Sequence, residues 1–113
     1  MECIFCRIIK GEIPAVKLFE NERIIAFNDI NSVAPTHILI LPKTHISTIN
    51  DIDSSNYHIV GECVKIAAEL AHEKGIAEGG YRLVYNCNSA GGQEVFHIHL
   101  HLLGGRQMKW PPG

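Results

Sequence analysis

Three histidines at a strict two-residue spacing constrain the fold of this chain more than any other feature. They lie in the run His97-Ile98-His99-Leu100-His101-Leu102-Leu103, where every residue between and after them is apolar. Side chains of a β-strand alternate between two faces, so the imidazoles would share one face while the apolar residues enter a core. Same-face neighbours lie about 6.5–7 Å apart, too far for three of them to bind one metal ion. The run therefore predicts a strand whose row of histidines faces a substrate.

Histidine suits such a row because its unperturbed pKa of about 6.5 lets it act as acid, base or nucleophile near neutral pH. The alternatives are a histidine-rich surface strand and a chelating pair for zinc or copper. A full His-x-His-x-His pattern with strand-forming spacers favours the functional row. Gly104 and Gly105 are expected to end the strand.

The chain has 113 residues, of which 46% are hydrophobic, which suits a single domain over residues 1–113. A net charge of −2 argues against nucleic acid as a partner. Nothing resembles a signal peptide, and no run approaches the roughly 20 apolar residues of a membrane span. The four cysteines then indicate reduced thiols or metal ligands and not disulfides, so we expect a cytoplasmic protein with no membrane partner.

Hydrophobic periodicity predicts an α+β fold. A short helix is expected to begin at Cys3 and end before Gly11, and a long helix is expected to run from His58 to Gly75. Alternating or continuous apolar runs predict strands at residues 16–19, 24–27, 36–41, 81–85 and 97–103. We expect about five antiparallel strands, with the long helix across one face.

A glycine pair, Gly91 and Gly92, directly precedes the histidine run. Glycines allow backbone N–H groups to turn inward and form a nest for an anion. An ordinary loop is the alternative, but the adjacent histidines favour phosphoryl binding. The loop is not a P-loop, and no residue is placed to hold Mg²⁺. Chemistry on a nucleotide would therefore require no metal and would rely on histidine.

Four segments resemble the histidine triad family. They are Pro35-Thr36-His37, Gly91-Gly92-Gln93, the run His97–Leu103, and Gly104-Gly105-Arg106-Gln107-Met108. The likeness is strongest to the Hint branch, the nucleoside phosphoramidate hydrolases, and it extends over nearly the whole chain to the Trp110-Pro111-Pro112-Gly113 ending.

The resemblance implies a role for each histidine. His99 would attack the α-phosphorus and form a nucleotidyl-histidine intermediate. His101 would bind a phosphate oxygen and stabilise developing charge. His97 and His37 would form a relay that orients His99 and keeps its attacking nitrogen unprotonated.

The resemblance also implies a pocket for a purine nucleotide of the AMP type. Asp29 would bind the ribose hydroxyls, although it also suits a turn residue that caps its own backbone. The expected phosphate-binding residues are Asn86, Gly92, Gln93, Glu94 and Val95. The expected base pocket is Phe5, Phe27, Ile30 and Leu39, for which a place in the hydrophobic core is the alternative.

Glu94 departs from the family pattern. Many relatives have a serine at this position, where it helps to protonate the leaving amine. A carboxyl group with a raised pKa can also act as a general acid, so Glu94 is a catalytic candidate that would affect which amines leave.

Cys3, Cys6, His45 and His97 match a zinc-binding set of other histidine triad branches. Two cysteines and two histidines suit tetrahedral zinc. Such zinc would be structural, with no cofactor required for catalysis, and it would compete with the relay role of His97. The alternative is that both cysteines are small buried apolar residues.

The expected function is hydrolysis of the P–N bond of purine nucleoside phosphoramidates. The resemblance further implies a homodimer with a continuous sheet, in which the tail, residues 106–113, lies at the interface near the partner's active site. The alternatives are dinucleoside polyphosphate hydrolysis or nucleotidyl transfer, and a nucleotide-binding scaffold with weak turnover.

Overall fold

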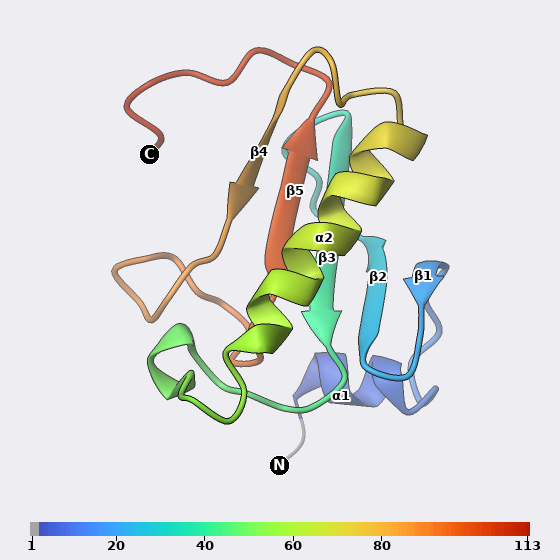
Figure 1. The fold of residues 1–113 in the computed structure, drawn as a ribbon, viewed down its shortest axis with the longest axis vertical. Coiled ribbons are helices and arrows are strands. Elements are labelled where there is room, and N and C mark those ends of the chain that lie inside the picture. The colour runs from blue at the N-terminus through green and yellow to red at the C-terminus, as the bar shows by residue number, and fades with distance from the viewer. Residues whose placement is uncertain (1–2) are drawn as a thin grey trace.

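One antiparallel sheet organises the molecule, with its five strands in the order β1-β2-β3-β5-β4. The computed structural model describes residues 3–113, so Met1 and Glu2 of the predicted domain lie outside it. The strands are β1 Lys17–Glu20, β2 Ile24–Asn28, β3 Thr36–Pro42, β4 Tyr81–Val84 and β5 Leu100–Gly104. The helices are α1 Ile4–Ile9, the 3-10 turn η1 Ile49–Asp51 and α2 His58–Glu73. This arrangement confirms the predicted α+β fold (Figure 1).

Helix α2 lies across one face of the sheet (Figure 1). Its buried residues recur at helical spacing and are Ile59, Cys63, Ile66, Ala67, Leu70 and Ala71. They pack against Ile38 and Ile40 of β3 and against Leu100 and Leu102 of β5. Among residues 3–113, no helix combines the length and the apolar character that crossing a membrane requires.

The opposite face of the sheet carries α1. Phe5 and Ile8 of this helix join a second hydrophobic cluster with Ile25, Phe27, Leu39 and Leu41. These strand residues alternate with those that face α2, as the two-residue period of a strand requires. The register places Leu39 opposite Phe27 on one side and opposite His101 on the other. His101 therefore lies on the α1 face, at the end of an apolar row.

Strand β5 begins later than the sequence predicts. The ladder starts at Leu100, which pairs with Ile40, so the prediction of a strand from His97 was wrong. The N–H group of Ile98 instead donates to the carbonyl oxygen of Ile46, at 2.8 Å, outside the sheet. The predicted alternation is nevertheless present, because Ile98, Leu100 and Leu102 all join the core beneath α2.

Candidate active site and metal centre

Four buried or half-buried histidines form a continuous group on the α1 face. The rings of His99 and His101 have centroids 4.9 Å apart, and those of His37 and His101 are 5.2 Å apart. His97 is fully buried, and the exposed fractions of His37 and His99 are 5% and 8%. His58 and His72 lie apart from this group and are exposed on α2. The structure thus brings together the histidines expected to carry catalysis.

The hydrogen bonds of His37 fix the proton positions of two rings. The N–H group of Val33 donates to His37 Nδ1 at 3.1 Å, so the proton of a neutral His37 is on Nε2. That nitrogen is 2.9 Å from Nδ1 of His101 and donates to it. The proton of His101 is therefore on Nε2, a buried atom with no hydrogen-bond partner among the described residues. A buried donor without a partner is the group expected to bind a ligand's oxygen.

The orientation of His99 comes from the backbone of His97. Nδ1 of His99 lies 2.7 Å from the carbonyl oxygen of His97. Since a carbonyl oxygen only accepts, Nδ1 carries the proton and Nε2 carries the lone pair. His99 thus has an unprotonated nitrogen beside a ring, His101, that presents an N–H group.

Burial keeps these rings uncharged. It lowers the pKa of His37 and of His99, and it lowers the pKa of His101 to about 4. Near neutral pH the rings are therefore neutral, and the proton positions given above apply. A neutral imidazole with a free lone pair is the form that acts as a nucleophile.

Asp29 lies at the edge of this group, directly after β2. Its Oδ1 accepts the N–H group of Asn31 at 2.8 Å, and its Oδ2 lies 3.4 Å from Nε2 of His37. Asp29 thus caps its own turn, which was the alternative to a ribose-binding role. It also places a carboxylate oxygen beside the histidines.

The expected base pocket divides into buried and exposed parts. Phe5, Phe27 and Leu39 all belong to the second hydrophobic cluster. The ring of Phe5 meets that of His99 edge-on, with centroids 5.0 Å apart, and its centroid is 5.7 Å from that of Phe27. Ile30, in contrast, is 94% exposed. The three buried residues therefore serve the core and also form the apolar edge of the site.

The glycine loop is held by the side chain of Gln93. Its Oε1 accepts the N–H group of Asn88 at 2.8 Å, and its Nε2 donates to the carbonyl oxygens of Ser47 and Val95 at 2.8 and 3.1 Å. Gly92 has a φ of 83°, a conformation that glycine adopts without strain. A Cβ at Gly91 would lie 2.6 Å from the carbonyl oxygen of Cys87.

This bracing determines which loop groups remain for a ligand. The N–H groups of Gly92 and Gln93 donate within the loop to Ser89 and Asn88. Within the described part of the chain, the N–H groups of Glu94 and Val95 have no such partner. Glu94 itself is exposed.

Asn86 follows β4 by two residues and is half-buried. No hydrogen bond joins its side chain to another residue of the described range 3–113. Its carboxamide therefore stays a predicted phosphate ligand.

A second cluster brings together Cys3, Cys6, His45 and His97 from three separate segments. Both cysteines are on the first turn of α1, where the N–H group of Cys6 donates to Cys3 Sγ at 3.2 Å. Nδ1 of His45 lies 3.6 Å from Cys3 Sγ and 3.3 Å from Cys6 Sγ. Nδ1 of His97 lies 3.4 and 3.5 Å from the same two atoms, and the two nitrogens are 3.1 Å apart.

These separations fit tetrahedral zinc. Zn–S bonds of about 2.3 Å and Zn–N bonds of about 2.0–2.1 Å place N···N and N···S pairs about 3.3–3.6 Å apart across a tetrahedral angle. The Nε2 atom of His97 donates to the carbonyl oxygen of Pro42 at 2.7 Å, so its Nδ1 lone pair is directed into the cluster. The same lone pair faces Nδ1 of His45 at 3.1 Å, a separation at which two ring nitrogens either share a proton or both bind a cation.

His97 therefore belongs to both sites by different atoms. Its ring faces the cysteines, while its carbonyl oxygen holds His99. The sequence predicted that the ring of His97 would help to orient His99. In the structure, the backbone carbonyl oxygen of His97 makes the contact with His99. The sequence analysis did not identify three backbone groups that bind histidine rings: the carbonyl oxygens of His97 and Pro42 and the N–H group of Val33. No side-chain pattern identifies such backbone partners.

Comparison with known proteins places these features in a wider context. A family model described as HIT domain matches residues 10–108. The purine nucleoside phosphoramidase of Escherichia coli strain K12 is 49% identical over 107 residues, covering 95% of this chain and 90% of that protein. A 14 kDa zinc-binding protein of Zea mays is 47% identical over 112 residues, covering 97% of this chain and 87% of that protein.

A solved structure of a HIT family hydrolase from Legionella pneumophila Philadelphia 1 superposes with a TM-score of 0.96 at 57% identity. The match covers 99% of this chain and 100% of that chain.

Proposed function

Because the chain belongs to the HIT domain family, we propose that it hydrolyses the P–N bond of purine nucleoside phosphoramidates, such as AMP joined to an amine. One observation carries the proposal: His99 has its lone pair on Nε2, beside a buried N–H group of His101 that has no protein partner among the described residues. A nucleophile next to a donor for the phosphate oxygen is the arrangement that nucleotidyl transfer to histidine needs. The identity to the bacterial phosphoramidase supports the choice of substrate.

The reaction divides into two steps. Nε2 of His99 attacks the α-phosphorus, the P–N bond breaks, and the amine leaves with a proton from the carboxyl group of Glu94, which regains a proton from water in the second step. The N–H group of His101 donates to a non-bridging phosphate oxygen and stabilises its growing charge. Water then attacks the nucleotidyl-histidine, which releases AMP and restores His99. The carbonyl of His97 stabilises the positive charge on the imidazole during both steps.

The remaining residues would hold the nucleotide. The carboxylate of Asp29 would accept hydrogen bonds from the ribose hydroxyls, and the free N–H groups of Glu94 and Val95 would bind phosphate, assisted by Asn86. Phe5, Phe27, Ile30 and Leu39 would contact the base. Gln93 acts through its side chain by fixing the shape of this loop.

The proposal is tested by steady-state assays on adenosine phosphoramidates and on diadenosine polyphosphates with the same protein preparation. We expect kcat/KM for the phosphoramidate to be higher. Preference for the polyphosphate would assign the chain to a dinucleoside polyphosphate hydrolase. AMP binding with no turnover of either substrate would assign it to a nucleotide-binding scaffold.

The Glu94→Gln variant is expected to lower kcat without changing the affinity for AMP. Glutamine keeps the size of the side chain but cannot supply a proton to the leaving amine. The loss should be greater for alkylamine leaving groups than for less basic aromatic amines, which need less protonation. The measurement is kcat for a series of amines, with Glu73→Gln on α2 as the control. Equal losses for all amines would instead assign Glu94 a structural role.

We also propose that Cys3, Cys6, His45 and His97 bind one zinc ion. The donor set and its separations fit tetrahedral zinc, and a 47% identical plant relative is named as zinc-binding. The ion would cross-link α1 to the segment after β3, which carries His45, and to the segment before β5, which carries His97. It would take no part in P–N cleavage. A reducing compartment such as the cytoplasm would keep both thiolates available.

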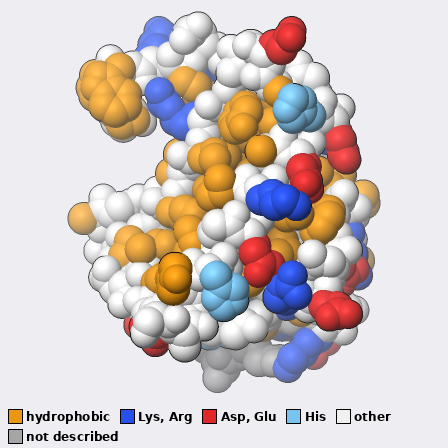
Figure 2. Space-filling model, viewed as in Figure 1, with side chains coloured by type: hydrophobic (Ala, Val, Ile, Leu, Met, Phe, Trp, Pro, Cys, Tyr) orange, Lys and Arg blue, Asp and Glu red, His pale blue; other side chains and the backbone are white. Residues whose placement is uncertain are grey.

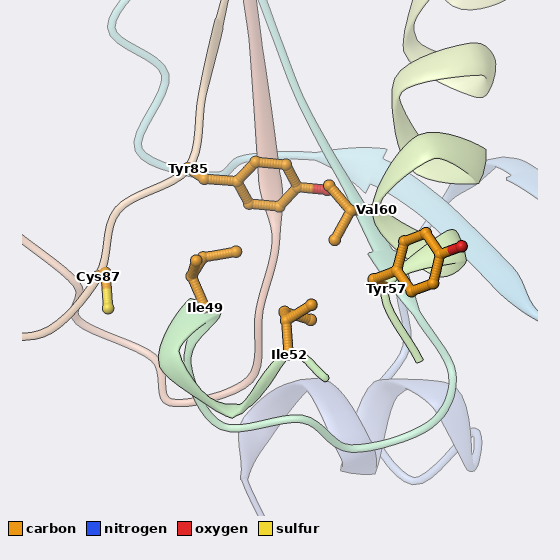
Figure 3. A pocket seen from close by; sticks show the side chains of 6 residues that line it. All are labelled: Ile49, Ile52, Tyr57, Val60, Tyr85 and Cys87. Atoms are coloured by element: carbon orange, nitrogen blue, oxygen red, sulfur yellow. The ribbon is translucent and has the colours of Figure 1, made fainter. Parts of the chain in front are cut away.

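A homodimer is proposed from the surface around β4, one of the two edge strands of the sheet. An apolar groove of about 430 Å³ beside it is formed by Ile49, Ile52, Tyr57, Val60, Tyr85 and Cys87. Figure 3 shows Ile49, Ile52, Val60 and Tyr85 converging on this groove from η1 and its C-cap, from α2 and from the segment after β4. On the same side, hydrophobic side chains gather along a hollow next to the C-terminal tail (Figure 2). An open strand edge flanked by apolar surface suits pairing with a second copy.

Deleting Trp110 to Gly113 is expected to leave the dimer intact but to change the preference among amine leaving groups. Trp110 is 82% exposed, and the tail is attached by a bond of 2.9 Å from Arg82 to the carbonyl oxygen of Lys109. An exposed tryptophan of this kind suits contact with a partner's active site. Sedimentation and kcat/KM for several amines provide the measurement. A monomeric truncated protein would show that the tail holds the dimer together, and unchanged specificity would place it outside the site.

A further inference from the structure

The metal centre and the nucleotide site share parts of the same three segments. We propose that zinc at Cys3, Cys6, His45 and His97 increases the affinity of the active site for its nucleotide, and that the nucleotide increases the affinity for zinc. This inference rests on the proposed function, which supplies both ligands. In this inference, the presence of zinc controls how tightly the substrate binds, and zinc takes no part in the bond-breaking step.

The first connection is His97. Its ring nitrogen Nδ1 faces both sulfur atoms, and its carbonyl oxygen accepts the hydrogen bond that orients His99. The same residue is anchored to β3 by the bond from Nε2 to Pro42. A metal ion on Nδ1 fixes the position of the whole residue, so it also fixes the acceptor on which the His99 tautomer depends.

The second connection is Phe5, which lies between the two cysteine ligands on α1. Its ring contacts the rings of His97 and His99 edge-on, with centroid separations of 6.1 and 5.0 Å. Helix α1 has six residues, which is too short for a helix to be stable by itself. Two metal–sulfur bonds on its first turn would hold Phe5 in place against the site.

The third connection is the segment from His45 to Ser47. Nε2 of His45 lies 3.2 Å from Ser47 Oγ, and the carbonyl oxygen of Ser47 accepts from Gln93 Nε2 at 2.8 Å. Gln93 in turn holds Asn88 and Val95 of the glycine loop. Fixing His45 on the metal therefore restrains the loop whose N–H groups would bind phosphate.

All three connections give coupling of the same sign. Ordering these groups costs conformational entropy, and whichever ligand binds first bears that cost for the second. Thermodynamic linkage requires the two ligands to raise each other's affinity by the same factor. Couplings of this kind typically amount to about 5- to 150-fold, and we expect a factor of about 10.

Calorimetric titration with AMP tests the inference on the full chain, loaded with Zn²⁺ or stripped with a chelator. We expect the dissociation constant for AMP to be about 10-fold lower in the zinc-loaded protein. The reciprocal arm measures Zn²⁺ affinity by competition with a chromophoric chelator, with and without saturating AMP, and should give the same factor. If the stripped protein unfolds, the Co²⁺ spectra of the variants below test the same inference on metal-loaded protein alone.

Two variants separate coupling from metal binding. Phe5→Leu leaves all four metal ligands in place and should reduce the coupling factor towards 1 while Zn²⁺ still binds. Phe19→Leu, on β1 against the core beneath α2, makes a similar change elsewhere and should leave the factor unchanged. With Co²⁺ in place of zinc, the thiolate absorption bands should shift on addition of AMP in the wild-type protein and in Phe19→Leu, and by clearly less in Phe5→Leu.

Each failure has a distinct signature. Equal AMP affinity with and without bound Zn²⁺ would overturn the coupling and leave the proposed hydrolase and the zinc site intact. Failure to bind Zn²⁺ would overturn both the metal site and the coupling, while phosphoramidase activity would still be measured. Failure to bind AMP in either form would overturn the proposed function and the coupling together.

Discussion

Replacing His99 with Ala is expected to lower kcat for a nucleoside phosphoramidate by about 10³-fold or more. The change removes the attacking nitrogen and leaves no other group in its position, since Nδ1 of His101 is occupied by His37. The phosphate loop and the apolar edge of the site remain, so AMP should still bind with an affinity within a few-fold of the wild type.

The measurement is single-turnover kinetics with calorimetric titration of AMP, and the matched control is His58→Ala on the exposed surface of α2. Quenching wild-type protein with substrate and mapping the adduct by mass spectrometry should locate the nucleotidyl group on His99. An adduct on His97 or His101 would overturn the assignment of the nucleophile. Retention of most activity in His99→Ala would refute covalent catalysis by this residue.

The double replacement Cys3→Ser with Cys6→Ser is expected to lower the thermal midpoint by about 10–20 °C. A ligand present at about 1,000 times its dissociation constant stabilises a folded protein by about 4 kcal/mol, and the variant loses this contribution. Helix α1 should be the part most affected, because the cluster joins it to His45 and His97. Turnover at saturating substrate should survive brief chelation of the wild-type protein.

Calorimetry and metal analysis of purified protein provide the test, with Cys87→Ser as a control outside the cluster. Wild-type protein should contain about one equivalent of zinc, and the double variant none. Metal-free wild-type protein from a zinc-rich medium would refute the site. Loss of kcat on chelation would give the metal a catalytic role.

Much of this architecture follows from patterns in the sequence. The two-residue alternation of the run from His97 predicted which side chains enter the core, and the helical stripe from His58 predicted α2. The family, the five-stranded sheet and an enzyme of this class were expected from the motifs and are confirmed. The four metal-site residues, far apart in the chain, are also brought together as expected.

What the sequence did not predict depends on backbone groups. The start of β5 at Leu100 reflects the bond from Ile98 to Ile46, a contact that periodicity does not encode. The proton positions in the histidine row depend on carbonyl and N–H groups that every residue possesses. Gln93 was expected to bind phosphate, but its N–H group donates within the loop to Asn88, and its side chain braces the loop.

The alternation of the sheet has a consequence for how this chain can change. Ile38 and Ile40 face α2, while His37 and Leu39 face the site, so the core beneath α2 and the candidate site occupy positions of opposite parity along the same strand. The side chains of the two sets lie on opposite faces of the sheet and contact different clusters. A single-residue insertion within β3 or β5 would exchange the two sets, turning histidines into the core and isoleucines or leucines into the site. Length changes in these strands are therefore tolerated only at their ends, whereas a substitution within a strand acts mainly on one face.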